Sequence, residues 1–270
     1  MTLLIHVLER SDARVLGALR CVDASTRAGV QAPLRVGIDG AQVRRNRSGL
    51  YVVSRADALA AHEEAFDAPP ATPALGSVAL TASIDDPSGA YLPRMAAIAL
   101  PRDPAPGHAA QADALFRPVE VAMYPAGTAP LGANWAALRV AVREAASGDA
   151  LGGALLLVVS GGTAVLARGL SDWRGEALVA VPGVPVTTWS DAHGAVVVSE
   201  TAVQLQVLFD PAAGLRSTAE RVRAGDAPDA PPHVDPDRLE AARATLPHAE
   251  LDLRIAAGRA QTLSIALALP

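Results

Sequence analysis

The sequence predicts a mainly β fold in which two tandem β-sandwich units are followed by a short C-terminal helix and a β-hairpin. Short apolar runs separated by Gly, Pro, Asp and Ser clusters dominate about the first two hundred residues, a pattern typical of strands and turns. Hydrophobic residues make up 50% of the 270 residues, so the chain must bury a core, yet aromatic residues make up only 3%. Two small cores built from Ala, Val and Leu agree with both the high hydrophobic content and the low aromatic content.

The first predicted unit spans residues 1–105 and is followed by a proline-rich connector at 106–134. Apolar runs bounded by turn residues predict the strands of the unit. The connector contains one alternating run that is also expected to form a strand. The strands expected in the unit are 17–22, 34–38, 50–53, 77–84 and 94–100, and the strand expected in the connector is 116–124.

The second predicted unit spans residues 135–212, and residues 213–270 are expected to form a linker, a short helix and the terminal hairpin. Asp235 followed by Pro236 is typical of a helix start. Two runs that alternate polar and apolar residues flank Gly258 and predict the hairpin. The strands expected in the unit are 136–143, 154–160, 163–167, 177–181, 195–199 and 202–209; the helices are expected within 214–224 and at 238–246, and the hairpin strands at 250–255 and 262–267.

Part of the first unit recurs in the second. The run ALRCV, which begins at Ala18, aligns with ALRVA, which begins at Ala137, 119 positions further on. A polar turn closed by Gly49 leads into a strand, and a similar turn is closed by Gly175. Glycine suits both positions because a tight turn into a strand puts one residue at positive φ. The repeat predicts two copies of one β-rich unit.

Three short motifs follow one another between residues 148 and 185. They are GDALGGALLLV at 148–158, the acidic turn LSDWRGEAL at 170–178 and the corner VPGVP at 181–185. In this order they resemble the carboxypeptidase-regulatory-like, transthyretin-like β-sandwich repeat. The resemblance covers 135–210 and, more weakly, 16–100, where Asn46 replaces the expected Asp and the corner is missing. It implies a transthyretin-like or immunoglobulin-like sandwich with no catalytic residues, of the kind used as stalks, spacers and recognition modules.

The whole arrangement is also similar to accessory proteins encoded with phage-tail-like contractile injection particles of GC-rich bacteria. This resemblance implies a non-catalytic structural or interaction protein that docks with protein partners in a larger assembly. We expect the terminal hairpin, separated from both units by residues 211–236, to complete the sheet of a neighbour or of the first unit. Deleting residues 249–270 would then abolish assembly and leave residues 135–210 folded.

Three aromatic residues, Trp173, Trp189 and Tyr51, are the candidate partner contacts. Trp173 is expected in a turn and Trp189 near a strand end, where an exposed ring can contact a partner. The two tryptophans could instead stack on a sugar, so a carbohydrate- or small-molecule-binding module is the alternative to a docking protein. A titration followed by tryptophan fluorescence distinguishes the two.

Charge and composition exclude several function classes. The formal net charge of −5 gives no electrostatic reason to expect a nucleic-acid partner. All 23 positive charges are Arg, which excludes Schiff-base lysines and lysine-containing phosphate loops. Cys21 is the only cysteine and the six histidines form no zinc-binding pair, so no catalytic site, metal or cofactor is predicted. Two local clusters are considered as metal sites. Residues 62–64 are interpreted instead as an exposed helix turn or loop, and residues 85–86 as part of a turn that could hold at most one weak calcium site.

The chain is expected to lie in the cytoplasm. No apolar stretch approaches the roughly 18–20 residues that a membrane span requires. The amino terminus has no basic region before its apolar run, so no signal peptide is predicted.

Overall fold

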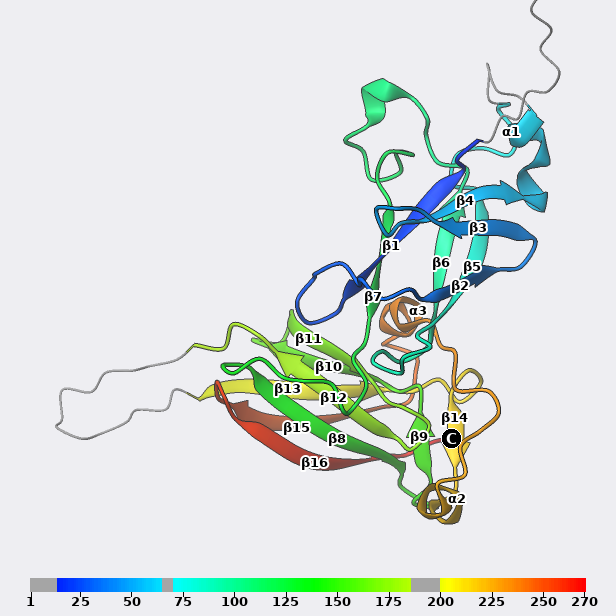
Figure 1. Cartoon of the computed structure of the whole chain (residues 1–270). Helices are drawn as coiled ribbons and strands as arrows, with labels where there is room; N and C mark the ends of the chain where they lie inside the picture. Colours follow the sequence, from blue (N-terminus) through cyan, green and yellow to red (C-terminus); the bar gives the residue numbers. More distant parts are fainter. Residues whose placement is uncertain (1–13, 65–69, 186–199) are drawn as a thin grey trace, which may run out of the picture. The chain divides into compact units, whose positions relative to one another are not determined.

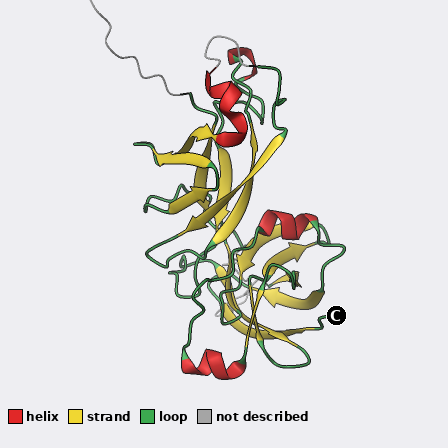
Figure 2. Cartoon of the chain, turned by 90° about the vertical axis from the view of Figure 1, so that its right-hand side faces the viewer, coloured by secondary structure: helices red, strands yellow, loops and turns green. Residues whose placement is uncertain are grey.

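A computed structural model describes residues 14–64, 70–185 and 200–270. The fold is mainly β, with 45% of the residues in strands and 10% in helices, which confirms the predicted fold class at this level (Figure 1). Figure 2 shows how few and short the helices are beside the strands. In the part of the chain that is described, no helix is long and apolar enough to cross a membrane.

The chain divides into two compact units. The first consists of Met1–Arg20, Gly37–Thr81 and Ala97–Glu120, and the second of Cys21–Val36, Ala82–Ala96 and Val121–Pro270. Several N-terminal strands contribute residues to both units. The domain limits expected from the sequence stay predictions.

The N-terminal strands form two sheets. A four-stranded sheet has the order β3-β4-β1-β7, and a three-stranded sheet has the order β2-β5-β6. The helices described in this part of the chain have three to five residues each. The elements are β1 (Gly17–Asp23), β2 (Arg35–Ile38), β3 (Ala41–Arg45), β4 (Tyr51–Ala56), the 3-10 helix η1 (Asp57–Leu59), α1 (Ala60–Glu64), β5 (Val78–Asp85), β6 (Arg94–Leu100), η2 (Pro106–His108) and β7 (Val119–Met123).

The remaining strands form two further sheets within the second unit. One has the order β11-β10-β13-β15, and the other has the order β12-β8-β9-β14 with β16 paired to β8. The elements are β8 (Ala136–Glu144), β9 (Ala150–Gly152), β10 (Leu155–Ser160), β11 (Ala164–Leu170), β12 (Glu176–Val181), β13 (Thr201–Leu208), β14 (Leu215–Ser217), α2 (Ala219–Ala224), α3 (Pro236–Ala241), β15 (His248–Ile255) and β16 (Ala260–Leu267).

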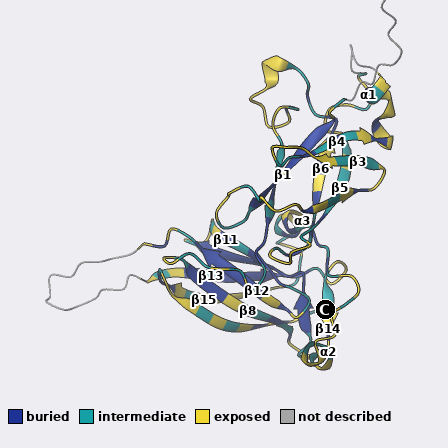
Figure 3. Cartoon of the chain, in the orientation of Figure 1, coloured by how far each residue is buried: buried dark blue, intermediate teal, exposed yellow. Residues whose placement is uncertain are grey.

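Side chains from both sheets meet in one apolar core. Leu138 and Val140 of β8 pack in the same cluster as Leu156 of β10 and Leu205 of β13. Strand β10 is buried on both faces, which explains why its sequence is a continuous apolar run rather than an alternating one. Figure 3 shows β13 buried along most of its length, whereas β15 is largely exposed.

The predicted terminal hairpin is wrong in its pairing, although both of its strands exist. Strand β15 pairs antiparallel with β13, and β16 pairs parallel with β8, so the two consecutive strands belong to opposite sheets. Ile255, Ile265 and Leu267 are part of the core cluster. The segment that precedes them is also integrated, since β14 pairs with β9. Deleting residues 249–270 would therefore remove core side chains from the second unit, in contrast to the expected detached module.

Most other predicted strands are present within a few residues of their expected ends. Strand β6 has the predicted limits, whereas β3, β9 and β14 were not predicted. The helix expected within 214–224 is reduced to α2, and the helix expected at 238–246 is the shorter α3, which begins at Pro236 behind the cap Asp235 as expected. The strand expected at 195–199 lies outside the described residues.

The two turns of the sequence repeat have the same hydrogen-bond pattern. In the first, Leu50 N donates to Asn46 Oδ1 (2.9 Å), and Gly49 N donates to the carbonyl of Asn46 (3.1 Å). In the second, Glu176 N donates to Asp172 Oδ1 (3.0 Å), and Gly175 N donates to the carbonyl of Asp172 (2.9 Å). The glycine φ angles are +79° and +75°. Asn46 and Asp172 therefore have the same structural role, which is to accept main-chain hydrogen bonds within their turns.

This equivalence makes Asp172 a testable source of pH dependence. Burial raises the pKa of the Asp172 carboxyl, although the backbone N–H groups of Glu176 and Arg174 that donate to it act in the opposite direction. A carboxyl whose pKa is raised on folding destabilises the fold increasingly as the pH rises from its unfolded pKa through its folded one. Asp172→Asn keeps the acceptor oxygen, as Asn46 does, so we expect it to raise the free energy of unfolding at neutral pH. Below about pH 3, where the unfolded carboxyl is also protonated, the gain should vanish. Urea denaturation of wild type and Asp172→Asn at both pH values measures the difference in unfolding free energy. An equal difference at both pH values would contradict a raised pKa of Asp172.

Candidate functional site

Strands β15 and β16 each have one edge without a strand partner among the described residues. The carbonyls of Arg259 and Leu267 accept hydrogen bonds from Ala137 N (3.0 Å) and Ala145 N (2.8 Å), so the odd-numbered residues of β16 direct their main-chain groups to β8. Because the N–H and C=O of one strand residue point to the same side, the even-numbered residues direct theirs to the open edge. The same argument applies to β15, since Phe209 N donates to the carbonyl of Pro247 (3.1 Å).

The two open edges differ in the side chains that accompany them. Along β15, every residue whose main chain faces outward is titratable, and all are exposed: His248, Glu250, Asp252 and Arg254. Along β16, the corresponding exposed residues are all small and uncharged: Ala260, Thr262, Ser264 and Ala266. Charged residues on an edge discourage pairing with another chain. Only the β15 edge carries this protection.

The outer face of the sheet β11-β10-β13-β15 is half apolar and half polar. The apolar half is a cluster of Leu155 and Leu157 of β10 and Leu208 of β13. Val234, which precedes α3, and Leu239 of α3 pack against them. The neighbouring positions are polar, because the register places Gln206 beside Glu250 and Gln204 beside Asp252. We call these four residues, Gln204, Gln206, Glu250 and Asp252, the polar strip.

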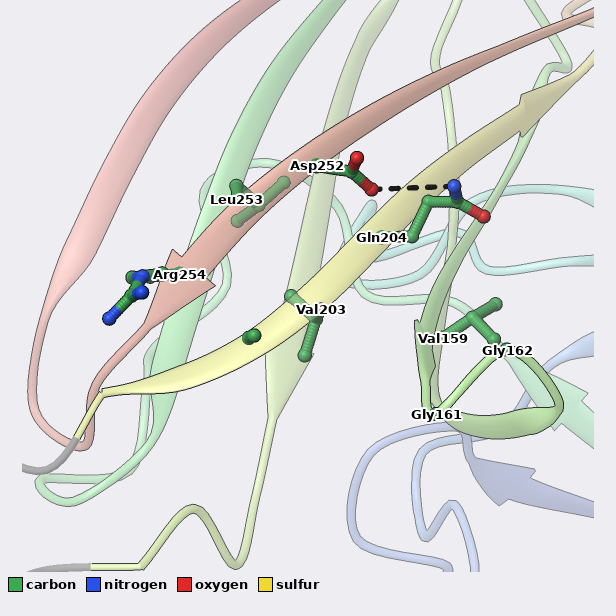
Figure 4. A pocket seen from close by; sticks show the side chains of 9 residues that line it. Val159, Gly161, Gly162, Val203, Gln204, Asp252, Leu253 and Arg254 are labelled. Carbon is green, nitrogen blue, oxygen red and sulfur yellow. Dashed lines mark hydrogen bonds between the residues drawn. The ribbon is translucent and has the colours of Figure 1, made fainter.

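Hydrogen bonds connect the members of the polar strip. Gln206 Nε2 donates to Gln204 Oε1 (2.6 Å) and to Glu250 Oε1 (3.0 Å). Gln204 Nε2 donates to Asp252 Oδ1 (3.4 Å), as the dashed line in Figure 4 shows. The strip borders two shallow cavities of the same unit. One, of about 420 Å³, is lined by Gln204 and Asp252 together with the Gly161–Gly162 turn, and the other, of about 400 Å³, by Gln206, Glu250, His248 and Arg243.

A third cavity, of about 500 Å³, lies beside α3, and three of its charged lining residues, Arg168, Asp237 and Glu240, take part in contacts that hold that helix. Arg168 binds Glu240 through two hydrogen bonds of 2.7 and 2.8 Å. Fully buried Arg94 donates to Asp237 Oδ2 (2.6 Å), and its guanidinium lies over the ring of Tyr124, which lines the cavity. Burial raises the pKa of Tyr124 to about 12, although Arg94 acts in the opposite direction. These contacts give the cavity a structural role in the second unit.

The structure does not bring the aromatic candidates together in one site. Tyr51 lies in β4 and is 5% exposed. It stands opposite Leu19 in the pairing of β4 with β1. Trp173 is half-buried in the turn before β12, and the guanidinium of Arg174 lies 5.1 Å from its ring centroid. Trp189 lies outside the described residues.

The two polar clusters noted in the sequence differ in how their side chains are satisfied, because His62 Nδ1 is buried without a hydrogen-bond partner among the described residues. Asp86 accepts hydrogen bonds from Ser88, Ala90 and Tyr91 within a turn. Burial acts to raise its pKa, but these hydrogen bonds outweigh it and lower the value. His62 is 4% exposed rather than on an exposed turn, and burial and Arg14 lower its pKa. No group of three or more potential metal ligands occurs among the described residues.

Cys21, the only cysteine, is buried in β1. Burial raises the pKa of its thiol to about 11, although Arg94 acts in the opposite direction. A thiol with so high a pKa is a weak nucleophile at neutral pH. Its surroundings therefore fit a packing role.

Sequence reasoning missed both the open edge of β16 and the polar strip. The alternating patterns QLQ at 204–206 and ELD at 250–252 mark polar strand faces, but they do not reveal which strands are neighbours. No protein-family model, curated protein or solved structure was found to match the chain.

Proposed function

We propose that the chain is a non-catalytic interaction protein that binds an extended segment of a partner protein along the open edge of β16. The observation that carries this proposal is the contrast between the two edges of the second unit. The β15 edge has a titratable side chain at each outward position, whereas the β16 edge has none. An uncharged edge strand of eight residues is a template for strand addition.

The chemistry of the edge suits such a partner. Thr262, Ser264 and Ala266 each offer an outward N–H and C=O, which a partner strand satisfies with main-chain hydrogen bonds. Their small exposed side chains leave room for the partner's backbone to approach. Parallel pairing with β8 and the core residues Ile265 and Leu267 hold the strand in place before any partner binds.

The partner belongs, in this proposal, to a larger assembly such as a phage-tail-like contractile injection particle. The support is the sequence resemblance of residues 148–185 to repeats that serve as stalks and recognition modules. The shared turn geometry at Asn46 and Asp172 supports the underlying repeat. A structural role in an assembly also agrees with an edge strand that is poised for pairing.

Ser264→Pro tests the proposal. The outward N–H of Ser264 is removed and the ring obstructs the approaching strand, whereas the hydrogen bonds from the neighbouring odd-numbered residues to β8 stay in place. Partners are captured from the native host with the tagged full chain and identified by mass spectrometry. We expect Ser264→Pro to capture at least tenfold less of the partner than the wild type does. Hydrogen exchange of the wild-type complex should show protection of the Thr262 and Ser264 amides.

Two matched variants serve as controls. Ser264→Ala changes the same side chain but keeps the N–H, so it should capture the partner as wild type does. Asp252→Pro makes the same backbone change on the β15 edge and should also retain the partner. Equal capture by wild type and Ser264→Pro, or no new protection along β16, would refute strand addition at this edge.

A further inference from the structure

Gln206 is the least satisfied member of the polar strip. Its side chain is 3% exposed, and its Oε1 atom has no hydrogen-bond partner in the described part of the chain. The amide nitrogen is already engaged with Gln204 and Glu250, which fixes the orientation of the carbonyl oxygen. Gln206 lines the shallow cavity of about 400 Å³ that it shares with Glu250, His248 and Arg243. A buried acceptor without a donor marks a place where a ligand can supply the missing hydrogen bond.

The groups around this acceptor define the chemistry of a ligand. Glu250 lines the same cavity, and only its Oε1 atom accepts a hydrogen bond within the described residues. His248 Nδ1 donates to the carbonyl of Leu246 (3.1 Å), and the same residue lines the cavity. Arg243 also lines the cavity, and its guanidinium group carries hydrogen-bond donors. The cavity thus combines several acceptors with one cationic donor.

These groups favour an uncharged ligand. An anion would meet the carboxylate of Glu250, and a cation would meet Arg243, so an ionic ligand of either sign faces a like charge. The hydroxyl groups of a neutral polyol donate to the carboxylate and amide oxygens and accept from the guanidinium without such a conflict. A volume of about 400 Å³ exceeds the space of one or two water molecules.

We propose that the cavity at Gln206 is a binding site for a neutral saccharide, with Gln206 Oε1 and Glu250 accepting from sugar hydroxyl groups and Arg243 donating to them. The site extends along the polar strip towards Gln204 and Asp252, where the second cavity continues the same face (Figure 4). This function is independent of strand addition, because the outward main-chain groups of β16 take no part in it.

Isothermal titration calorimetry of the full chain with neutral trisaccharides tests the proposal. The panel consists of maltotriose, cellotriose, xylotriose, mannotriose and N,N′,N″-triacetylchitotriose. We expect at least one of them to bind with a Kd in the millimolar range or tighter. Gln206→Leu should weaken this binding at least tenfold. It removes the unsatisfied oxygen and also the two hydrogen bonds that Nε2 donates, so the melting temperature of the variant is measured alongside.

Two further variants complete the experiment. Arg243→Ala changes a partly exposed residue and should also weaken binding, which keeps the test decisive if Gln206→Leu fails to fold. Gln42→Leu makes the same exchange on exposed strand β3 and should bind as wild type does. Absence of binding by every trisaccharide up to on the order of 10 mM would overturn the proposal. Unchanged binding by both Gln206→Leu and Arg243→Ala would overturn it as well.

Discussion

Gly175→Ala is expected to destabilise the second unit by about 3 kcal/mol or more. Gly175 has a φ of +75°, which alanine adopts only with strain. A Cβ atom added there would clash with the carbonyl oxygen of Val142, which is backbone and cannot move aside. The same glycine accepts the hydrogen bond of Val142 N (2.8 Å), so any shift of the turn would also weaken the pairing of β12 with β8. Urea denaturation measures the loss.

The equivalent turn of the repeat supplies the control. Gly49 has a φ of +79°, but a Cβ atom there would meet only the end of the flexible Arg45 side chain at 3.5 Å. Gly49→Ala should therefore show only the cost of the left-handed conformation, about 1 kcal/mol. If the two substitutions destabilised their units equally, close approach to Val142 would not be the reason for glycine at position 175.

Arg94→Ala is expected to cost about 3–5 kcal/mol of unfolding free energy. The Arg94 side chain is 0% exposed and donates to the carbonyls of Met95 (2.9 Å) and Ala122 (2.8 Å) as well as to Asp237 (2.6 Å). Alanine leaves a void and deprives these acceptors of their donor. Chemical denaturation of the full chain gives the change in free energy.

The ion pair itself should contribute little to this effect. The Asp237 side chain is 73% exposed, and exposed pairs are typically worth less than about 1 kcal/mol. Asp237→Asn is therefore expected to change stability by less than about 1 kcal/mol, since Arg94 keeps its two carbonyl partners and a second carboxylate, Asp235, 3.5 Å away. A loss in Asp237→Asn as large as that in Arg94→Ala would show that the charge interaction, and not the buried hydrogen bonds and packing, dominates.

Strand positions could be predicted from the sequence where a short apolar run is bounded by turn residues. Strand β6 is such a run between Pro93 and Pro101, and it was predicted with its observed limits. Strand β3, with the sequence AQVRR, has no buried residue, so its pattern gave no signal. Strands β9 and β14 have only three residues each, too few for a period to appear.

Strand pairing could not be predicted in the same way. Alternation around Gly258 favours a hairpin, but it describes the faces of β15 and β16 and not their neighbours. Ile255 and Ala256 are consecutive and both buried, which a simple hairpin with one solvent face does not require. That pair is the local sign of a chain that crosses between sheets. Because the polar strip joins residues of β13 and β15 that are far apart in sequence, it depends on the same pairing.

The division of β15 and β16 between opposite sheets has a consequence for biosynthesis. Each sheet of the second unit receives one strand from the stretch 248–267, and these strands pair with β13 and with the much earlier β8. The apolar faces of β8, β10 and β13 therefore emerge from the ribosome before the strands that finish covering them. Such long-range pairings slow folding, so this half of the chain should depend on chaperones during synthesis more than its strand content alone suggests.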